Sequence, residues 1–313
     1  MKSKLFAVLL LITSFANAQK IEKYYNYLWK ETTPDAARFF SVIQKTDSGW
    51  HRRDYFIHER MLQMDGNYKD SACKISIGKF HYYHPNGMIQ ETGNYIEGKK
   101  DSLWLSFYPD GMMEDSAFYI NGNRSGTNMS WYQNGFPRDS SVFNPDGSGM
   151  EIRWFDNGMP GTAGVYEAGR KAIGRWQYFH SNGKLSSLEI YKEGKLIDKQ
   201  YFDENGNAMT DTTNNDREAE FPGGPKAWSK YVYKGLYFPE QYKIVNSDSA
   251  VVVVNFVIGT DGKIKESYVS TPFYPQFDKI ALAVMQKSPQ WIPARNHNRN
   301  IYAYRSQGIS FHQ

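Results

Sequence analysis

The stretch GKFHYYHPNGMIQETGNYIEG, residues 78–98, places aromatic residues at fixed distances from an Asn-Gly pair. An Asn-Gly pair is favoured in two-residue β-hairpin turns, where both central residues need positive φ. Tyr83 lies three residues before Asn86, Tyr95 lies nine residues after it, and Gly98 closes the stretch. Aromatic side chains pack well on a pleated surface and favour strands. The stretch therefore predicts two strands joined by a tight turn.

The same pattern recurs along the chain about every 24 residues. The turn residues are Asn86, Asp110, Asn134, Asn157, Asn182 and Asn205, and each is followed by glycine. An aromatic residue stands three places before each turn residue, at Tyr83, Phe107, Trp131, Trp154, Phe179 and Phe202, and another nine places after the first five, at Tyr95, Tyr119, Phe143, Tyr166 and Tyr191. Two turns per repeat leave about eight residues per strand, a usual strand length. We expect one antiparallel hairpin per repeat, chained into a long meander whose aromatic rows form the core.

Residues 78–209 resemble the MORN family of repeats, in the variant form found in bacterial antitoxin-like proteins. The segments GKFHYYHPNG, GRWQYFHSNG and GNYIEGKKDSLWLSFYPDG carry the resemblance. The resemblance implies a scaffold that makes protein contacts and sometimes lipid contacts. Residues 19–77 contain further strand-like runs around Asp47-Ser48-Gly49 and a short helix start at Pro34, so we expect them to cap the repeat sheet at its N-terminal end.

The N-terminus has the composition of a secretory signal peptide. Lys2 and Lys4 precede an apolar run, and Ala16-Asn17-Ala18 forms a small-x-small cleavage site. The apolar run is too short for the roughly 20 residues that span a bilayer. We expect residues 1–18 to be cleaved and the protein to be periplasmic or secreted, with no transmembrane helix in the mature chain.

Charge and cysteine content indicate two domains without disulfide bridges. Residues 221–313 hold eleven Lys and Arg against five Asp and Glu, whereas residues 20–220 are acidic on balance. Cys73 is the only cysteine, so an internal disulfide is excluded, and an inert thiol is expected. The polar segment at 210–220 is interpreted as an exposed linker between the two domains.

The C-terminal residues 221–313 lack the repeat and predict a small α+β domain. Residues 249–270 form two strand-like runs around Asp261-Gly262, and residues 300–311 a closing strand. Between them, apolar residues at helical spacing predict an amphipathic helix that ends before Pro289, and these residues are Phe277, Ile280, Ala281, Val284 and Met285. The whole chain is therefore predicted to be mainly β, a meander of hairpins followed by a small α+β domain.

This domain resembles the C-terminal domain of TonB-type proteins. The matching segments are FPGG at 221–224, YFPE at 237–240, VVVVNFVIGTDGKI at 251–264, WIPA at 291–294 and the final GISF, whereas NHNRN replaces the glycine that usually follows the W-x-P-A element. The resemblance implies that the last strand adds a short extended segment of an envelope or outer-membrane protein to its edge, in connection with TonB-dependent transport. The contact residues expected on this basis are Tyr302, Tyr304, Arg305 and Arg299.

No motif in the sequence indicates catalysis. His81 and His84 are the only close histidine pair, and their spacing places them on opposite faces of a strand, so no metal site is expected. No nucleophile or phosphate-binding motif occurs in context, and we expect a non-enzymatic protein without a cofactor. We expect no nucleic-acid partner, because the protein is expected to be exported. Two alternatives remain open at this point: binding of cell-wall glycan such as peptidoglycan, or of lipid, by the repeat face, and an enzyme with an unrecognised site.

Overall fold

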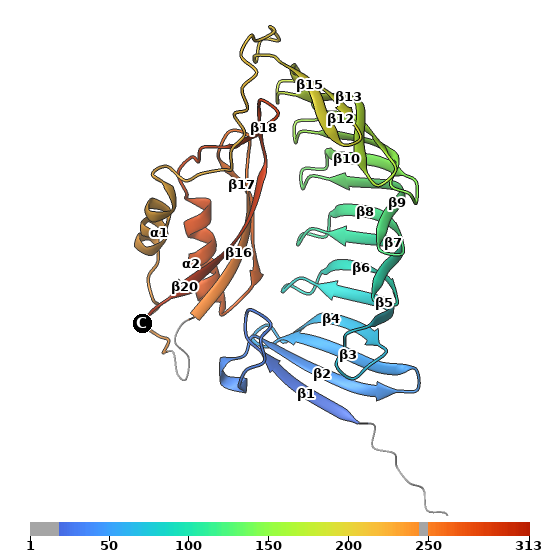
Figure 1. The fold of residues 1–313 in the computed structure, drawn as a ribbon. Helices are drawn as coiled ribbons and strands as arrows, with labels where there is room; N and C mark the ends of the chain where they lie inside the picture. Colours follow the sequence, from blue (N-terminus) through green and yellow to red (C-terminus); the bar gives the residue numbers. More distant parts are fainter. Residues whose placement is uncertain (1–18, 244–249) are drawn as a thin grey trace, which may run out of the picture.

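The computed structural model describes residues 19–243 and 250–313, so the expected signal peptide at 1–18 lies outside the described residues. The predicted fold class is confirmed. One antiparallel sheet contains fifteen strands in sequence order, and a small region with two helices and a three-stranded sheet follows it. Figure 1 shows the fifteen strands as a curved stack of hairpins with the C-terminal region on its concave side.

The fifteen strands pair only with their neighbours in the chain, so the sheet is a pure meander. They are β1 (Lys20–Tyr25), β2 (Phe39–Thr46), β3 (Gly49–Phe56), β4 (Met61–Tyr68), β5 (Ser76–Tyr83), β6 (Ile89–Ile96), β7 (Lys99–Phe107), β8 (Met113–Ile120), β9 (Asn123–Trp131), β10 (Pro137–Phe143), β11 (Gly149–Trp154), β12 (Pro160–Glu167), β13 (Lys171–Phe179), β14 (Leu185–Lys192) and β15 (Lys195–Tyr201). The segment expected as an N-terminal cap supplies β1–β4 and the short 3-10 helix η1 (Pro34–Ala36) to this same assembly.

The turn at each Asn-Gly pair differs from the two-residue turn expected for it. Of the pair Asn86-Gly87, only Gly87 has positive φ, at 82°, and its N–H donates to the carbonyl of His84 at 2.8 Å. The Asn86 side chain instead accepts the N–H of Met88 at 3.1 Å. The turn with two positive φ values lies at the other end of the hairpin, at Glu97 and Gly98, with φ of 50° and 77°. Asparagine is therefore used at position 86 for its side chain, since its backbone is not left-handed.

The turn asparagines also join consecutive repeats. The Nδ2 of Asn86 donates to the carbonyl of Pro109 in the next turn at 2.7 Å. Asn134, Asn157 and Asn182 repeat this bond with Asp156, Ser181 and Glu204. Asp110 has no amide to donate, and there the direction reverses, because the Gln133 side chain donates to the Asp110 carboxylate at 2.7 Å. A ladder of side-chain hydrogen bonds therefore holds the turns in register.

The aromatic core lies on a different row from the one expected. Residues three places before each turn are only half-buried, Tyr83 among them. The buried row lies six places before the turn, where Phe80, Trp104 and Trp176 are almost fully buried. The residues nine places after the turn do join this core, because Tyr95 packs edge-on against both Phe80 and Trp104 at 4.8 Å between ring centroids. The expectation for the row at Tyr83 was wrong because residues three places apart on one strand, such as Phe80 and Tyr83, point to opposite faces of the sheet.

The C-terminal region contains the expected helix and one further helix. Its elements are α1 (Gly224–Gly235), β16 (Ala250–Ile258), β17 (Ile264–Thr271), α2 (Pro275–Gln286), β18 (Ala294–Asn296), β19 (Arg299–Ile301) and β20 (Ala303–Phe311). All five apolar residues predicted for the helix are buried on α2. The helix α1 was not predicted, although Pro225 lies in its first turn, a position that favours proline. The three larger strands form a sheet in the order β17-β16-β20.

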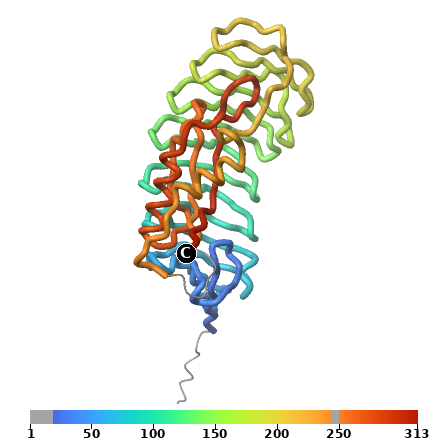
Figure 2. The backbone as a smooth tube through the Cα atoms, turned by 90° about the vertical axis from the view of Figure 1, so that its left-hand side faces the viewer, coloured from blue at the N-terminus to red at the C-terminus, as the bar shows by residue number. Residues whose placement is uncertain are grey.

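This second sheet lies between its own helices and the repeats. Val252, Val254, Phe256, Ile309 and Phe311 pack together with α2 in one hydrophobic core. The other face of the sheet is turned towards the concave side of the meander (Figure 1), and Figure 2 shows the C-terminal region running along the stack of hairpins. The segment expected as a linker lies alongside this region and pairs with it through β-bridges, from Arg217 to Arg295 and from Glu220 to Ile292. Within residues 19–243 and 250–313, no helix combines the length and apolar character needed to cross a membrane.

Candidate functional site

The concave face carries a row of side chains two places before the turns of the first five repeats, and four of the five are hydrogen-bond donors. His84, Tyr108, Tyr132 and His180 occupy this row and are buried. Each side chain meets a backbone carbonyl of the next repeat, and the acceptors are Phe107 at 2.8 Å, Trp131 at 2.9 Å, Trp154 at 2.7 Å and Phe202 at 3.0 Å. Because a carbonyl only accepts, the histidine Nε2 atoms carry hydrogen here. Phe155 occupies the row between Tyr132 and His180 and has no donor to offer.

Arg299 supplies the donor that Phe155 lacks. Its Nη1 donates to the carbonyl of Phe179 at 3.1 Å, which is the position that the row leaves open, and also to the carbonyl of Gly161. Its Nη2 donates to Oγ1 of Thr162 at 2.7 Å. Burial lowers the pKa of Arg299 to about 10, so the guanidinium stays protonated at neutral pH. The hairpin formed by β18 and β19 thereby docks on the repeat sheet.

The tip of this hairpin makes further contacts with the last repeats. The Nδ2 of Asn298 donates to the carbonyl of Phe202 at 2.9 Å. The imidazole of His297 stacks on Tyr178 with 3.6 Å between ring centroids and lies 2.8 Å from Oε1 of Glu189. Burial alone would raise the pKa of Glu189, but hydrogen bonds, first of all from His297, lower it overall. We call His297, Asn298 and Arg299 the latch.

A second anchor holds the opposite end of the C-terminal region. The guanidinium of Arg38, just before β2, lies 3.8 Å from the ring centroid of Phe273, and its Nη2 donates to the carbonyl of Val251 at 3.4 Å. The imidazole of His58 packs on Tyr274 at 4.2 Å between centroids. The C-terminal region is therefore attached near both ends of the meander.

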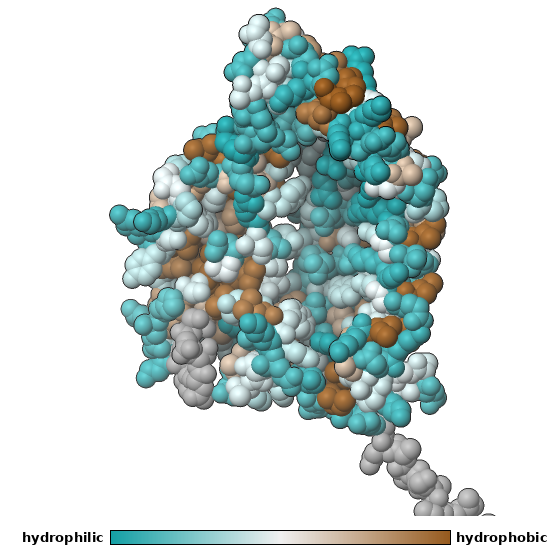
Figure 3. Space-filling model, in the orientation of Figure 1, coloured by the Kyte–Doolittle hydropathy of each residue, from teal (hydrophilic) through white to brown (hydrophobic). Residues whose placement is uncertain are grey.

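A cleft separates the two sheets between these anchors, and Figure 3 shows it opening between the repeats and the C-terminal region. Its larger cavity measures about 640 Å³ and lies between the middle repeats and the start of β20. A smaller cavity of about 270 Å³ continues towards β17. Tyr304 lines both cavities, so the cleft follows β20.

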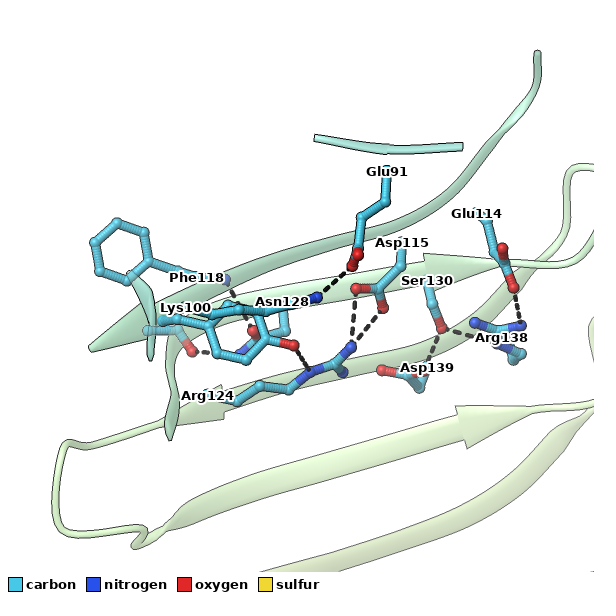
Figure 4. Close-up of polar contacts among 12 residues, drawn as sticks. Glu91, Lys100, Glu114, Asp115, Phe118, Arg124, Asn128, Ser130, Arg138 and Asp139 are labelled. Atoms are coloured by element: carbon cyan, nitrogen blue, oxygen red, sulfur yellow. Dashed lines mark hydrogen bonds and ion pairs between the residues drawn. The ribbon is translucent and has the colours of Figure 1, made fainter. Parts of the chain in front are cut away.

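Charged side chains of β10 and β11 line the larger cavity on the side of the repeats. Both Nε and Nη2 of Arg153 donate to one oxygen of Glu151, Oε1, at 3.0 and 2.8 Å. The other oxygen of Glu151 accepts the hydroxyl of Tyr166 at 3.0 Å. The Nε of Arg138 donates to Ser130 at 3.1 Å, and Ser130 in turn donates to Asp139. Figure 4 shows Arg138 also paired with Glu114, and beside this group a separate pair of Arg124 with Asp115.

The four residues expected to contact a partner all border this cleft. Arg299 and Tyr302 are already engaged within the chain, since Tyr302 packs on Tyr132 and its hydroxyl accepts the N–H of Asp156 at 3.4 Å. Tyr304 has 55 % of its surface exposed. Arg305 donates to Glu218 at 2.9 Å on the surface. Tyr304 and Arg305 are therefore the two with surface left for a partner.

No pattern in the sequence indicated the repeat residues that line the cleft. Arg138 and Arg153 do not belong to any recognised motif. Carboxylates such as Glu151 are frequent along the strands and do not stand out. The one usable signal is Phe155, an apolar residue in a row that is otherwise His or Tyr in the first five repeats. Across the described ranges 19–243 and 250–313, no group of three His, Cys, Asp or Glu side chains is placed to hold a metal ion. A scan against protein-family models gives no match, and a search of curated proteins finds no similar sequence.

Proposed function

We propose that the chain is a non-enzymatic, exported protein-interaction module of the cell envelope. In this proposal the TonB-like C-terminal region recognises an extended segment of an envelope protein by adding it as a strand to β20. The MORN-like repeats serve as the scaffold that presents this edge. The sequence resemblances and the signal-peptide pattern suggest the compartment, and no cofactor is required.

The edge position of β20 is the observation that carries the proposal. β20 pairs with β16 over nine consecutive residues, from Ala303 to Phe311. In the described part of the chain its other edge pairs with no strand. An open edge offers backbone N–H and C=O groups to an incoming strand, and side-chain pockets then select among sequences. The cleft beside Tyr304 is such a pocket.

The scaffold role is supported by the two anchors. Arg38 and the latch hold the C-terminal region at sites far apart in the meander. A preorganised edge loses less entropy when it binds a segment than a mobile one does. The repeats would in this way raise the affinity of β20 for the partner without binding the partner themselves.

Proline substitutions in β20 test strand addition in the full chain. N–H groups along a strand point alternately to its two edges, so one of the two neighbours Tyr304 and Arg305 donates towards β16 and the other towards the open edge. We expect one of Y304P and R305P to keep the thermal stability of the parent and to lose capture of its envelope partner. Affinity capture from detergent-solubilised envelope, with mass spectrometry, measures the partner.

The alanine variant R305A is the matched control, because it removes the side chain and keeps the N–H group. It should retain most of the capture, since backbone bonds supply the affinity. Capture of the same partner by both proline variants, with the fold intact, would disprove strand addition at β20.

A further inference from the structure

The larger cavity of the cleft has the composition of a ligand site in its own right. Its volume of about 640 Å³ lies within the range usual for small-molecule sites. Three guanidinium groups border it, from Arg138, Arg153 and Arg299, against two carboxylates, from Asp139 and Glu151. The ionised lining therefore carries a positive balance, which favours an anionic ligand.

Unused hydrogen-bonding capacity points in the same direction. The Nε and Nη2 groups of Arg153 both donate to a single oxygen of Glu151. Its third nitrogen, Nη1, has no partner among the described residues. The Nε of Arg299 is buried without a partner in the described part of the chain, although the residue keeps only 8 % of its surface exposed. A buried donor without an acceptor costs free energy, and here that cost falls on a residue that lines the cavity.

The rest of the lining suits a ring that bears hydroxyl groups. Aromatic rings of Tyr132, Phe155, Trp176 and Tyr302 form apolar walls. Between them, Asp139 and Glu151 offer carboxylate acceptors close to the arginine donors. Sugar hydroxyls both donate and accept, and the C–H faces of a sugar ring pack on aromatic rings. An anion rich in negative charge, such as phosphate, is disfavoured by the same two carboxylates.

We propose that this cavity binds a carboxylate-bearing sugar, with the carboxylate on Arg153 and the ring between the aromatic walls. The proposal does not depend on strand addition at β20. Two sources supply this chemistry, free uronic acids and the lactyl-substituted sugar of cell-wall glycan, and the choice of probes separates them.

Calorimetric titration of the full chain, without its expected signal peptide, tests the proposal. N-acetylmuramic acid and N-acetylglucosamine differ only in the lactyl ether that carries the carboxylate, and glucuronic acid and glucose form a second matched pair. A charge-assisted hydrogen bond predicts at least about tenfold tighter binding of the acid in a pair. Preference within the first pair alone identifies a cell-wall sugar, and preference within the second identifies uronic acids.

The variant R153M/E151Q removes the arginine without leaving a buried carboxylate unpaired. It should weaken binding of the preferred acid by at least about tenfold while thermal unfolding stays close to that of the parent. The control R175M removes an exposed arginine of β13 that alternation places on the opposite face from Trp176, and it should bind as the parent does. The proposal is wrong if acid and neutral sugar bind alike, if none binds at millimolar concentration, if R153M/E151Q binds unchanged, or if inorganic phosphate binds as tightly as the acid.

Discussion

A single side chain, Phe155, marks the place in the repeats where Arg299 of the C-terminal region is bound. Its neighbours in the same row, Tyr132 and His180, each serve the carbonyl of the following repeat. At Phe155 that carbonyl belongs to Phe179 and is served by Arg299 from the C-terminal region. The missing donor at position 155 therefore leaves a carbonyl free to bind an arginine that is distant in the sequence.

This relation predicts a rescue between positions 155 and 299. R299M leaves the carbonyls of Gly161 and Phe179 without their donor, so we expect the free energy of unfolding to fall by about 2–4 kcal/mol. Adding F155Y restores a hydroxyl in the row and should recover about 1 kcal/mol, measured by urea unfolding. F155Y alone should gain nothing, because Arg299 already occupies the carbonyl. An additive pair of effects would contradict the shared acceptor.

The second anchor predicts a pH dependence that centres on His58. Burial first, and the charge of Arg38 second, lower the pKa of His58 to about 4. Between the unfolded value of about 6.5 and this pKa, only the unfolded chain takes up the proton, so stability falls as the pH falls through this window. Asp278 acts in the opposite sense, because burial raises its pKa to about 7. Glu59 also lies near Arg38, and burial raises its pKa.

The variant H58F isolates the histidine contribution, since it keeps a ring against Phe273 and Tyr274. We expect the parent to lose about 1–2 kcal/mol more than H58F between pH 6.5 and pH 4, after allowance for solvent screening of a half-buried group. Urea unfolding across this pH range measures the difference. Parallel pH profiles of the two proteins would exclude His58 as the titrating group.

At the scale of the hairpin, glycine and bulky aromatics are paired from one repeat to the next. A Cβ added at Gly93 would stand 2.1 Å from the ring of Trp104, and one added at Gly164 would stand 2.1 Å from that of Trp176. Ala117 takes the corresponding place in the next repeat, where the facing residue is Asn128 in place of tryptophan. Of these three positions, the two that face a tryptophan of the neighbouring repeat hold glycine, which has no Cβ to meet the ring.

This pairing predicts that G93A is destabilising and that its effect depends on Trp104. Because the closest atoms belong to a packed ring, we expect G93A to cost about 1–3 kcal/mol by overpacking, measured by thermal unfolding. The matched change A117G, which faces Asn128, should cost about 1 kcal/mol or less, mainly from backbone entropy. Equal effects of the two substitutions would show that glycine at 93 is not required by the ring.

The hairpins were predictable because their determinants are local. An Asn-Gly pair every 24 residues is sufficient for the turn and for the order of the strands, as β5–β15 show. The face of the sheet on which each aromatic residue lies was not predictable, since Tyr83 and Phe80 are both aromatic. They are distinguished only by the alternation of side chains along β5 and by the register shift between Tyr82 and Tyr83. The cleft escaped prediction for a further reason. Arg153 and Arg299 lie 146 residues apart, and nothing local to either residue indicates that they share a cavity.

At the scale of the whole molecule, the latch and the Arg38 anchor set the separation of the two sheets. His297 and Asn298 both have left-handed backbone, with φ of 52° and 60°. The variant H297N/N298G keeps a sequence suited to this turn while removing the bonds to Glu189 and Phe202. Combined with R299M, it should leave both parts folded and free the upper end of the C-terminal region.

Small-angle X-ray scattering provides the measurement, and we expect a larger radius of gyration for this triple variant than for the parent. Circular dichroism should confirm unchanged strand content. An unchanged radius of gyration would mean that the Arg38 anchor alone fixes the arrangement.

The attachment of the C-terminal region at both ends of the meander makes the protein an arch closed by a tie. A single-layer meander has no second layer to resist bending, since each hairpin touches only the next. The tie shares that load, so tension applied along the stack must first release the contacts of Arg38 or Arg299 before the arch can straighten. The molecule is thereby stiff at small extensions and compliant at larger ones. The force at which it changes is set by the contacts of a few side chains.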